Sequence, residues 1–366
     1  MERIRIDASR CYEVIIGGGV LSRLGEMASS LVKGRKCAVV ADDTTRDLFF
    51  DEVHRLLSEA GFSVCDFVIP HGEESKSAES YVNLLEFLAE QGLTRADCMV
   101  ALGGGVVGDL TGFAASSFLR GISFIQVPTT LLSAVDSSVG GKTAINLRAG
   151  KNLAGAFYQP SLVLCDTDII RELPEEIFSE GMAEVIKYGA IGSEKVLDMC
   201  LDGAHENLDA LIAECVRMKR DIVAQDEFDL GLRQLLNLGH TPAHSIEKLS
   251  GFEISHGRAV AIGMCLMAIA GERLSSAAAD FDGELPDFTP GFAAEISELC
   301  RKYALPTECP YTARELATYA MSDKKRSANE ITLVLPVMRG KSELVRYTVD
   351  EVEGVFENGL KKDGIV

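Results

Sequence analysis

The chain is 366 residues long, with 47% hydrophobic and 25% charged residues and a formal net charge of -19 at pH 7. This composition is typical of a globular protein, and the length is more than one hydrophobic core usually supports, so two domains are expected. The negative charge would repel nucleic acid and an anionic membrane surface, so neither is a favoured partner. An anionic small-molecule ligand would need a local cluster of basic residues.

The start of the chain predicts no export. Residues 1–7 are charged and lack the apolar region of a signal peptide, and the apolar run at 259–271 is too short to cross a bilayer. The ten cysteines are scattered and most lie in apolar runs, which indicates buried, reduced thiols. We therefore expect a cytoplasmic protein.

Short β-branched runs alternate with helical patterns in the first half of the chain. The predicted strands are 12–16, 37–41, 63–69, 98–102, 123–127 and 162–166. This alternation predicts a largely parallel sheet with helices on its faces.

The pattern changes after Pro174, where helical periodicity takes over. Predicted helical stretches are 182–190, 208–225, 243–249 and 259–274, followed by a late strand at 331–336. We therefore expect an α/β domain at 1–172 and a mostly α-helical domain at 173–366.

A glycine-rich turn follows the strand predicted at 98–102. Gly103, Gly104 and Gly105 lead directly into a helical pattern, so backbone N–H groups at a helix N-terminus could bind a pyrophosphate. A tight turn without a ligand is the alternative. Thr129 and Thr130 follow the next predicted strand, where they could contact a nucleotide or cap a helix.

Three of the six histidines are concentrated in one segment of the helical domain. His240 and His244 are four residues apart and can share a helix face, and His256 follows. Together with Glu184, two of these imidazoles would form a zinc site with one open position. The spacing leaves open which two histidines bind, and a structural histidine pair is the alternative.

Basic residues form a candidate anion site in this acidic chain. Lys142 and Lys151 lie beside glycines, where the backbone can close around a ligand. Further cations are Arg120, Lys187, Lys219, Arg233, Lys324 and Lys325. As a set they could bind a phosphate and a carboxylate, although each one alone could be a solvated surface residue.

These motifs together resemble the 3-dehydroquinate synthase family. The resemblance runs in the same order over most of the chain. It is carried by Gly103–Asp109, Phe118–Gly121, Gln126–Leu132, Val135–Thr143, Gly150–Leu153, Gly181–Gly189, Arg233–Glu247 and His256–Met264, with looser matches at Gly72–Lys76 and Asp323–Lys325. It implies a Rossmann-like NAD-binding domain followed by a helical metal- and substrate-binding domain, in a homodimer.

The resemblance also implies roles for individual residues. The implied NAD contacts are Asp42, Glu73, Lys76, Gly104, Gly105, Val106, Asp109, Thr129, Thr130, Lys142 and Lys151. The implied ligands of zinc or cobalt are Glu184, His240 and His256. The implied substrate residues are Asp136, Lys142, Asn152, Lys187, Lys219, Arg233, Asn237, His244 and Lys324 or Lys325, with Arg120 supplied across a dimer interface. His244 is our hypothesis for a proton shuttle.

The implied reaction converts 3-deoxy-D-arabino-heptulosonate 7-phosphate into 3-dehydroquinate and phosphate, in the shikimate pathway. NAD transiently oxidises the sugar, phosphate is eliminated, the hydride returns, and an aldol step closes the ring. The alternatives are another sugar phosphate cyclase, or a metal- and NAD-dependent polyol dehydrogenase. Glu172, Asp229 and Arg258 depart from the residues that the family usually has at these positions.

Overall fold

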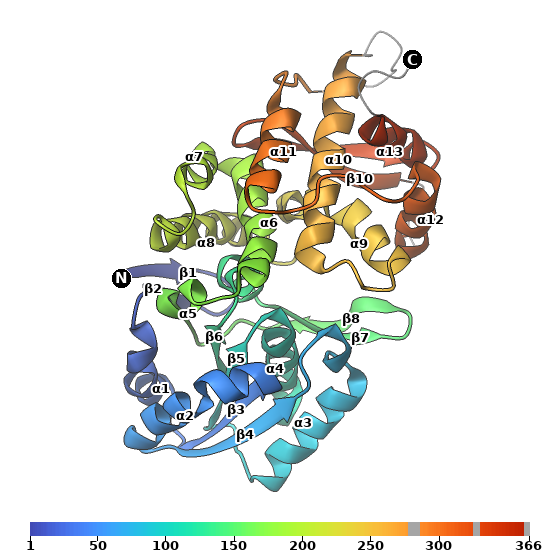
Figure 1. Ribbon diagram of the computed structural model, residues 1–366. Helices are drawn as coiled ribbons and strands as arrows, with labels where there is room; N and C mark the ends of the chain where they lie inside the picture. Colours follow the sequence, from blue (N-terminus) through green and yellow to red (C-terminus); the bar gives the residue numbers. More distant parts are fainter. Residues whose placement is uncertain (277–285, 325–329, 362–366) are drawn as a thin grey trace. The chain divides into compact units, whose positions relative to one another are not determined.

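The computed structural model describes residues 1–276, 286–324 and 330–361. The chain forms two compact units, the first made of Met1–Pro174 and Leu208–Phe228, the second of Glu175–Asn207 and Asp229–Val366. The predicted fold class is confirmed, since a parallel sheet with helices forms the first unit and the second is mostly helical (Figure 1). One helix, α8 (Leu208–Gln225), departs from the predicted division at 172, because it packs on β1 and η4 of the first unit.

A seven-stranded sheet organises the first unit. Its spatial order is β1 (Glu2–Ile6), β2 (Tyr12–Gly17), β9 (Leu162–Asp166), β6 (Ser123–Pro128), β5 (Cys98–Gly103), β3 (Lys36–Asp42) and β4 (Ser63–Ile69). All six predicted strands are present and pair in parallel. The sequence patterns missed β1, which pairs antiparallel with β2 at the sheet edge.

Helices cover both faces of this sheet (Figure 1). They are α1 (Leu24–Leu31), α2 (Asp43–Glu59), α3 (Ala78–Glu90) and α4 (Gly105–Ser117). Along β3, Val39 joins the core with α2, and its neighbour Val40 joins the core with α3 and α4. Because successive side chains of a strand point to opposite faces, both faces are filled with apolar side chains. Polar ligand-binding residues are therefore left for the ends of the strands.

Shorter elements connect and flank the sheet. They are η1 (Val20–Arg23), η2 (Glu73–Ser75), η3 (Phe118–Arg120), the π-helix η4 (Ser133–Ser137), α5 (Thr167–Arg171), and an antiparallel hairpin of β7 (Lys142–Leu147) and β8 (Gly150–Phe157). The hairpin, which packs on α4, was also missed by the sequence patterns. Its glycines and polar residues lack the β-branched signal of the buried strands.

In its described residues, the second unit is a group of helices with one hairpin. Its helices are α6 (Glu175–Gly192), α7 (Glu194–Asp202), η5 (Leu232–Asn237), α9 (His240–Leu249), α10 (His256–Ser276), α11 (Phe292–Lys302), α12 (Ala313–Lys324) and α13 (Val352–Leu360). The hairpin is β10 (Glu330–Met338) with β11 (Lys341–Thr348), so the late strand predicted at 331–336 is confirmed. The helical stretches predicted at 182–190, 243–249 and 259–274 lie within α6, α9 and α10.

Helix α10 is the centre of the second unit. It contacts α6, α9, α11, α13 and β10. Among the described residues it is the one helix long and apolar enough to cross a membrane, but 72% of its apolar window is buried inside the protein. Its apolar character is therefore that of a core helix.

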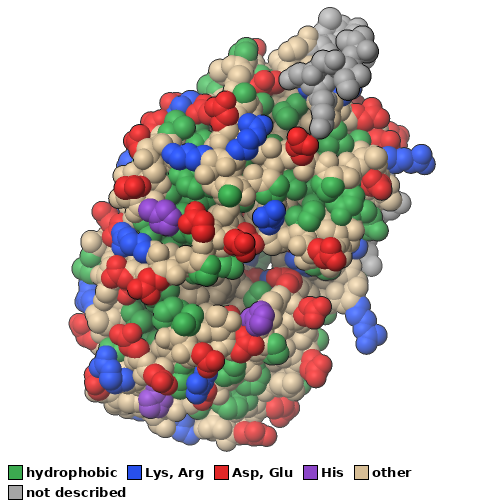
Figure 2. Space-filling view, viewed as in Figure 1, with side chains coloured by type: hydrophobic (Ala, Val, Ile, Leu, Met, Phe, Trp, Pro, Cys, Tyr) green, Lys and Arg blue, Asp and Glu red, His purple; other side chains and the backbone are tan. Residues whose placement is uncertain are grey.

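Acidic side chains are spread over the face of the protein drawn in Figure 2, with lysines and arginines between them. The net charge of -19 is thus not concentrated in one patch on this face.

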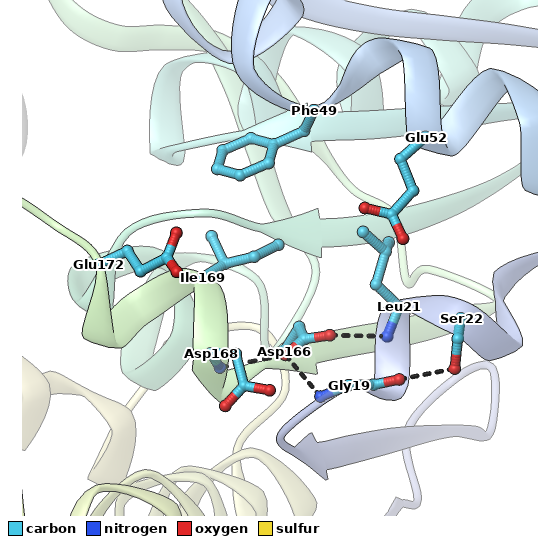
Figure 3. A pocket seen from close by; sticks show the side chains of 9 residues that line it. All are labelled: Gly19, Leu21, Ser22, Phe49, Glu52, Asp166, Asp168, Ile169 and Glu172. Atoms are coloured by element: carbon cyan, nitrogen blue, oxygen red, sulfur yellow. Dashed lines mark hydrogen bonds between the residues drawn. The ribbon is translucent and has the colours of Figure 1, made fainter.

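A buried carboxylate fixes the end of strand β9. Asp166, only 4% exposed, accepts hydrogen bonds from the backbone N–H groups of Gly19 (3.0 Å), Leu21 (2.9 Å) and Asp168 (3.0 Å), as Figure 3 shows. One side chain thereby caps α5 and ties the β2–η1 turn to β9.

We expect Asp166→Ala to lower the free energy of unfolding by about 2–3 kcal/mol. The substitution removes the carboxylate that accepts hydrogen bonds from three backbone N–H groups, and these groups are then left without an acceptor. Urea unfolding followed by circular dichroism measures the change. The matched control is Asp168→Ala, whose side chain is 63% exposed and pairs only at the surface with Arg171. Equal losses in the two variants would contradict the role given to Asp166.

Candidate nucleotide site and metal centre

Three potential metal ligands converge in the second unit. Glu184 lies in the middle of α6, and His240 and His256 are the first residues of α9 and α10. One ligand atom from each lies within 4.8 Å of the others. The Nε2 atoms of His240 and His256 lie 3.5 and 3.4 Å from Glu184 Oε1. One carboxylate and two imidazoles fit zinc or a similar divalent ion with a position left for a ligand.

Close backbone contacts bring these three helices together. A Cβ atom on Gly257, next to His256, would lie 2.3 Å from the carbonyl oxygen of Glu180 in α6. A Cβ on Gly263 of α10 would lie 2.1 Å from the carbonyl oxygen of Gly239, which itself has φ +77 just before His240. Glycine at these positions lets α10 approach α6 and the start of α9 closely enough for the ligands to meet.

Partners on the far side of each imidazole fix its orientation. His256 Nδ1 lies 3.4 Å from Glu247 Oε1, and His240 Nδ1 lies 3.1 Å from the carbonyl oxygen of Leu238. Both Nε2 atoms are thus directed to the same carboxylate, as in many histidine metal sites. No motif in the sequence indicated Glu247, although it lies two helical turns after His240 on the same helix.

The two histidines differ in protonation when no metal is bound. Burial lowers the pKa of His240 to about 3, although Glu184 acts in the opposite direction. Burial also acts to lower the pKa of His256, but Glu184 and Glu247 outweigh it and raise the pKa to about 10. A metal at His256 would therefore displace a proton, so metal uptake weakens as pH falls.

Two other residues implied by the resemblance, Lys187 and His244, lie near these ligands in the sequence, and one is buried while the other is exposed. Lys187 is buried and pairs with Glu184. The exposed ring of His244 has its centre 5.7 Å from that of His240 and 6.5 Å from that of His256. His244 is outside the ligand group found among the described residues. Among the described residues, the geometry thus makes His240 and His256, with Glu184, the candidate ligand set.

The remaining predicted residues of the second unit lie on two helices. On η5, Arg233 is buried and Asn237 is exposed. Lys324 is the last residue of α12, and Lys325 lies outside the described residues.

The glycine-rich turn for which we predicted a pyrophosphate lies between β5 and α4 of the first unit. Gly103 ends β5 and Gly105 begins α4, and no side chain among the described residues caps that helix. A Cβ on Gly104 would lie 3.3 Å from Thr130 Cγ2, and one on Gly105 would lie 3.2 Å from Ser137 Oγ. These small residues give a ligand access to the N–H groups of the first turn, which includes Val106.

Neighbouring strand ends carry further predicted nucleotide residues. Asp42 ends β3 and its carboxylate caps α2 by accepting from Thr45 N–H at 2.8 Å. Thr129 is buried behind Gly103, whose carbonyl oxygen accepts from its N–H at 3.1 Å. Thr130 forms reciprocal hydrogen bonds with Ser133, so capping and nucleotide contact are compatible roles at these positions.

Two buried lysines in the first unit pair with carboxylates. Lys76, 4% exposed, donates to Asp109 Oδ2 and to Asn152 Oδ1, each at 2.5 Å. Lys219 of α8, 5% exposed, donates at 2.9 Å to the carboxylate of Asp136. Asp136 lies in the π-helix η4, a helix type that often occurs at functional sites. Because α8 packs on η4 within the first unit, Lys219 lies next to Asp136 although the two are far apart in the sequence.

The last predicted cations are more exposed. Lys142, at the start of β7, is exposed, and Lys151 Nζ lies 3.9 Å from Glu73 Oε1. Arg120 is exposed at the end of η3, where both Leu119 (φ 50) and Arg120 (φ 65) have left-handed backbone conformations. Such conformations are strained for these residues and are often found where a side chain is held out for function.

We expect Glu247→Gln to weaken zinc binding by about 10- to 100-fold, because the carboxylate that orients His256 is lost. Competition with a chromophoric chelator measures the affinity. Glu253→Gln, a change at an exposed position shortly before His256, is the matched control. Unchanged zinc affinity in the Glu247 variant would show that Glu247 does not support the centre.

Comparisons with known proteins place this arrangement in one family. The 3-dehydroquinate synthase N-terminal family matches residues 66–180, and the 3-dehydroquinate synthase C-terminal family matches residues 181–326. The 3-dehydroquinate synthase of Streptococcus suis (strain 05ZYH33) is 39% identical over 349 residues, covering 93% of this chain and 95% of the relative.

Solved structures of sugar phosphate cyclases share the fold. A 2-deoxy-scyllo-inosose synthase complexed with carbaglucose-6-phosphate, NAD+ and Co2+ superposes with a TM-score of 0.84 at 26% identity, covering 98% of this chain and all of that chain. A 2-epi-5-epi-valiolone synthase from Streptomyces hygroscopicus subsp. jinggangensis 5008, with NAD+ and Zn2+ bound, has a TM-score of 0.83 at 23% identity, covering 98% and 99%. Family matches in both halves and a relative aligned over nearly its full length lead to one conclusion: the chain belongs to the 3-dehydroquinate synthase family.

Proposed function

We propose that the protein is a lyase that converts 3-deoxy-D-arabino-heptulosonate 7-phosphate into 3-dehydroquinate and phosphate. The observation that carries the proposal is the convergence of Glu184, His240 and His256, within a chain that matches 3-dehydroquinate synthases over 93% of its length. The product would enter the shikimate pathway.

Two bound groups would supply chemistry that amino acids lack. A zinc or cobalt ion held by Glu184, His240 and His256 would act as a Lewis acid toward the sugar hydroxyls. NAD, held at the α4 N-terminus and by Glu73, Lys76 and Asp109, would accept a hydride and return it.

The protein's own side chains would position the sugar phosphate and move protons. Lys142, Asn152 and Arg233 would bind its phosphate and carboxylate, so that the leaving group is oriented for elimination. Lys187 and Lys219, paired with Glu184 and Asp136, would donate hydrogen bonds to the substrate from their ammonium groups. The exposed imidazole of His244 would take up and release a proton at a ring nitrogen.

Two rival functions are distinguished by their products. A polyol dehydrogenase would release NADH and would need no phosphate site, which leaves Lys142, Lys151 and Arg233 without a role. A sister cyclase would release phosphate but form a different carbocycle. The greater similarity to 3-dehydroquinate synthases than to the inosose and valiolone synthases favours the first function.

We expect zinc-loaded protein with catalytic NAD to release many phosphates per NAD from the heptulosonate phosphate, without accumulation of NADH. Phosphate release is followed colorimetrically and NADH by its absorbance, and the product is identified by mass spectrometry. A chelator should stop phosphate release, and added zinc or cobalt should restore it. Accumulation of NADH without phosphate would instead identify a dehydrogenase.

We also propose that the protein acts as a homodimer in the cytoplasm. Arg120 is exposed on a strained backbone in the first unit, which suits a side chain that reaches into the substrate site of a partner subunit. The ten free cysteines, most of them buried, suit a reducing compartment and support the cytoplasmic location.

Mixing two inactive variants tests this role of Arg120. Arg120→Ala and Lys142→Ala should each be inactive, but after subunit exchange half of the dimers would contain one complete site, which predicts about a quarter of wild-type activity. Phosphate release measures the recovery, and analytical ultracentrifugation verifies the dimers. If Arg120 served its own subunit, every site would lack one residue and the mixture would stay inactive.

A further inference from the structure

We propose that Asn146 is a positioning residue that links the NAD-binding residues Glu73 and Lys76 to the substrate-binding residue Asn152. The inference rests on the proposed function, because that function gives Glu73, Lys76 and Asn152 their ligands. Asn146 itself is assigned no ligand. Its proposed role is to make the binding of NAD and of the sugar phosphate interdependent.

The side chain of Asn146 bridges two of these residues directly. Its Nδ2 donates to Glu73 Oε1 at 2.7 Å, and its Oδ1 accepts from the backbone N–H of Asn152 at 2.9 Å. Its backbone N–H donates to the carbonyl oxygen of Lys76 at 2.8 Å. One residue thus contacts all three positions, and its amide supplies both the donor and the acceptor that the bridge requires.

Asn146 lies at an irregularity of the β7–β8 hairpin. Ile145 pairs with Ala154 and Leu147 pairs with Gly150, so the residues 151–153 of β8 face Asn146 alone. Within this bulge Asn152 has φ +56, a left-handed conformation that asparagine tolerates better than most residues. Bulges of this kind re-aim side chains near active sites. The hydrogen bond from Asn152 N–H to Asn146 holds the bulge in this form.

The conformation of Asn152 in turn places its side chain on Lys76. Asn152 Oδ1 accepts from Lys76 Nζ, which also donates to Asp109. The result is a continuous chain of hydrogen bonds, from Glu73 through Asn146 and Asn152 to Lys76 and Asp109. A dinucleotide that orders Glu73 or Lys76 would therefore hold Asn152 in its conformation before the sugar phosphate binds. In the same way, a bound sugar phosphate that orders Asn152 would hold Glu73 and Lys76 for the dinucleotide.

The test measures the coupling between two ligands. Isothermal titration gives the Kd of NAD with zinc-loaded protein, alone and with a saturating 5-deoxy analogue of the heptulosonate phosphate, which cannot be oxidised at C5. For the wild type we expect the analogue to tighten NAD binding by at least about 5-fold, the lower range of typical coupling between sites. Asn146→Ala should reduce this factor to about 1 while each ligand still binds alone.

Two further variants make the result specific. Asn146→Asp keeps the shape and the acceptor for Asn152 N–H, but it replaces the donor to Glu73 with a repelling carboxylate, so it should also lose the coupling. Asn83→Ala, an exposed asparagine on α3 of the same unit, should keep it. If Asn146→Ala proves unfolded by circular dichroism, Asn146→Asp decides by the same measurement.

The outcomes separate this inference from the proposed function. Wild-type coupling that persists in folded Asn146 variants would overturn the inference, as would a wild type that turns over but shows no coupling. A wild type that binds neither NAD nor the analogue would count against the proposed function itself. Loss of coupling in both Asn146 variants, with Asn83→Ala unchanged, supports the positioning role.

Discussion

The structure depends on the pairing of buried lysines with carboxylates. Lys76, Lys187 and Lys219 are each at most 5% exposed, and each contacts an acidic side chain: Asp109, Glu184 and Asp136, respectively. Burying a lone charge would cost several kcal/mol of folding free energy, so each of these lysines is held in the folded protein as a neutral pair with its carboxylate. Burial raises the pKa of Asp109, and Lys76 offsets part of that effect. The anionic groups of a ligand must compete with these internal carboxylates, which favours ligands that bring several charges at once.

Much of the fold could be predicted because the buried strands carry a strong local signal. In β3 and β5 nearly every residue is buried, so β-branched and other apolar residues dominate and the strand is evident from a few positions. Strands β1, β7, β8 and β11 are more exposed or carry glycine, so they lack this apolar signal although each pairs with a strand next to it in the sequence. The location of α8 was unpredictable for a different reason: its periodicity shows that it is a helix, but not that it packs on β1 and η4, which are far away in the sequence.

The site was predictable as a set of residues and less so as a set of contacts. Spacing alone left open which two histidines bind, because it does not show that the loop after α9 returns His256 to the N-terminal end of that helix, beside His240. The hydrogen-bond chain through Asn146 joins residues far apart in the sequence, and Glu247 meets His256 only because the loop between α9 and α10 reverses the chain. These contacts depend on how the helices and strands pack, for example on the close approach of α10 at Gly257 and Gly263, and local sequence patterns do not show that packing.

The burial of α10 has a consequence for the life of the protein in the cell. This helix is as apolar as a membrane span, and it is covered only while α6, α9, α11, α13 and the β10 hairpin surround it. During synthesis α6 and α9 precede α10, but α11, β10 and α13 follow it, so part of its apolar surface stays uncovered until those elements are made. The incomplete second unit therefore exposes apolar surface, which favours aggregation until its last elements are made.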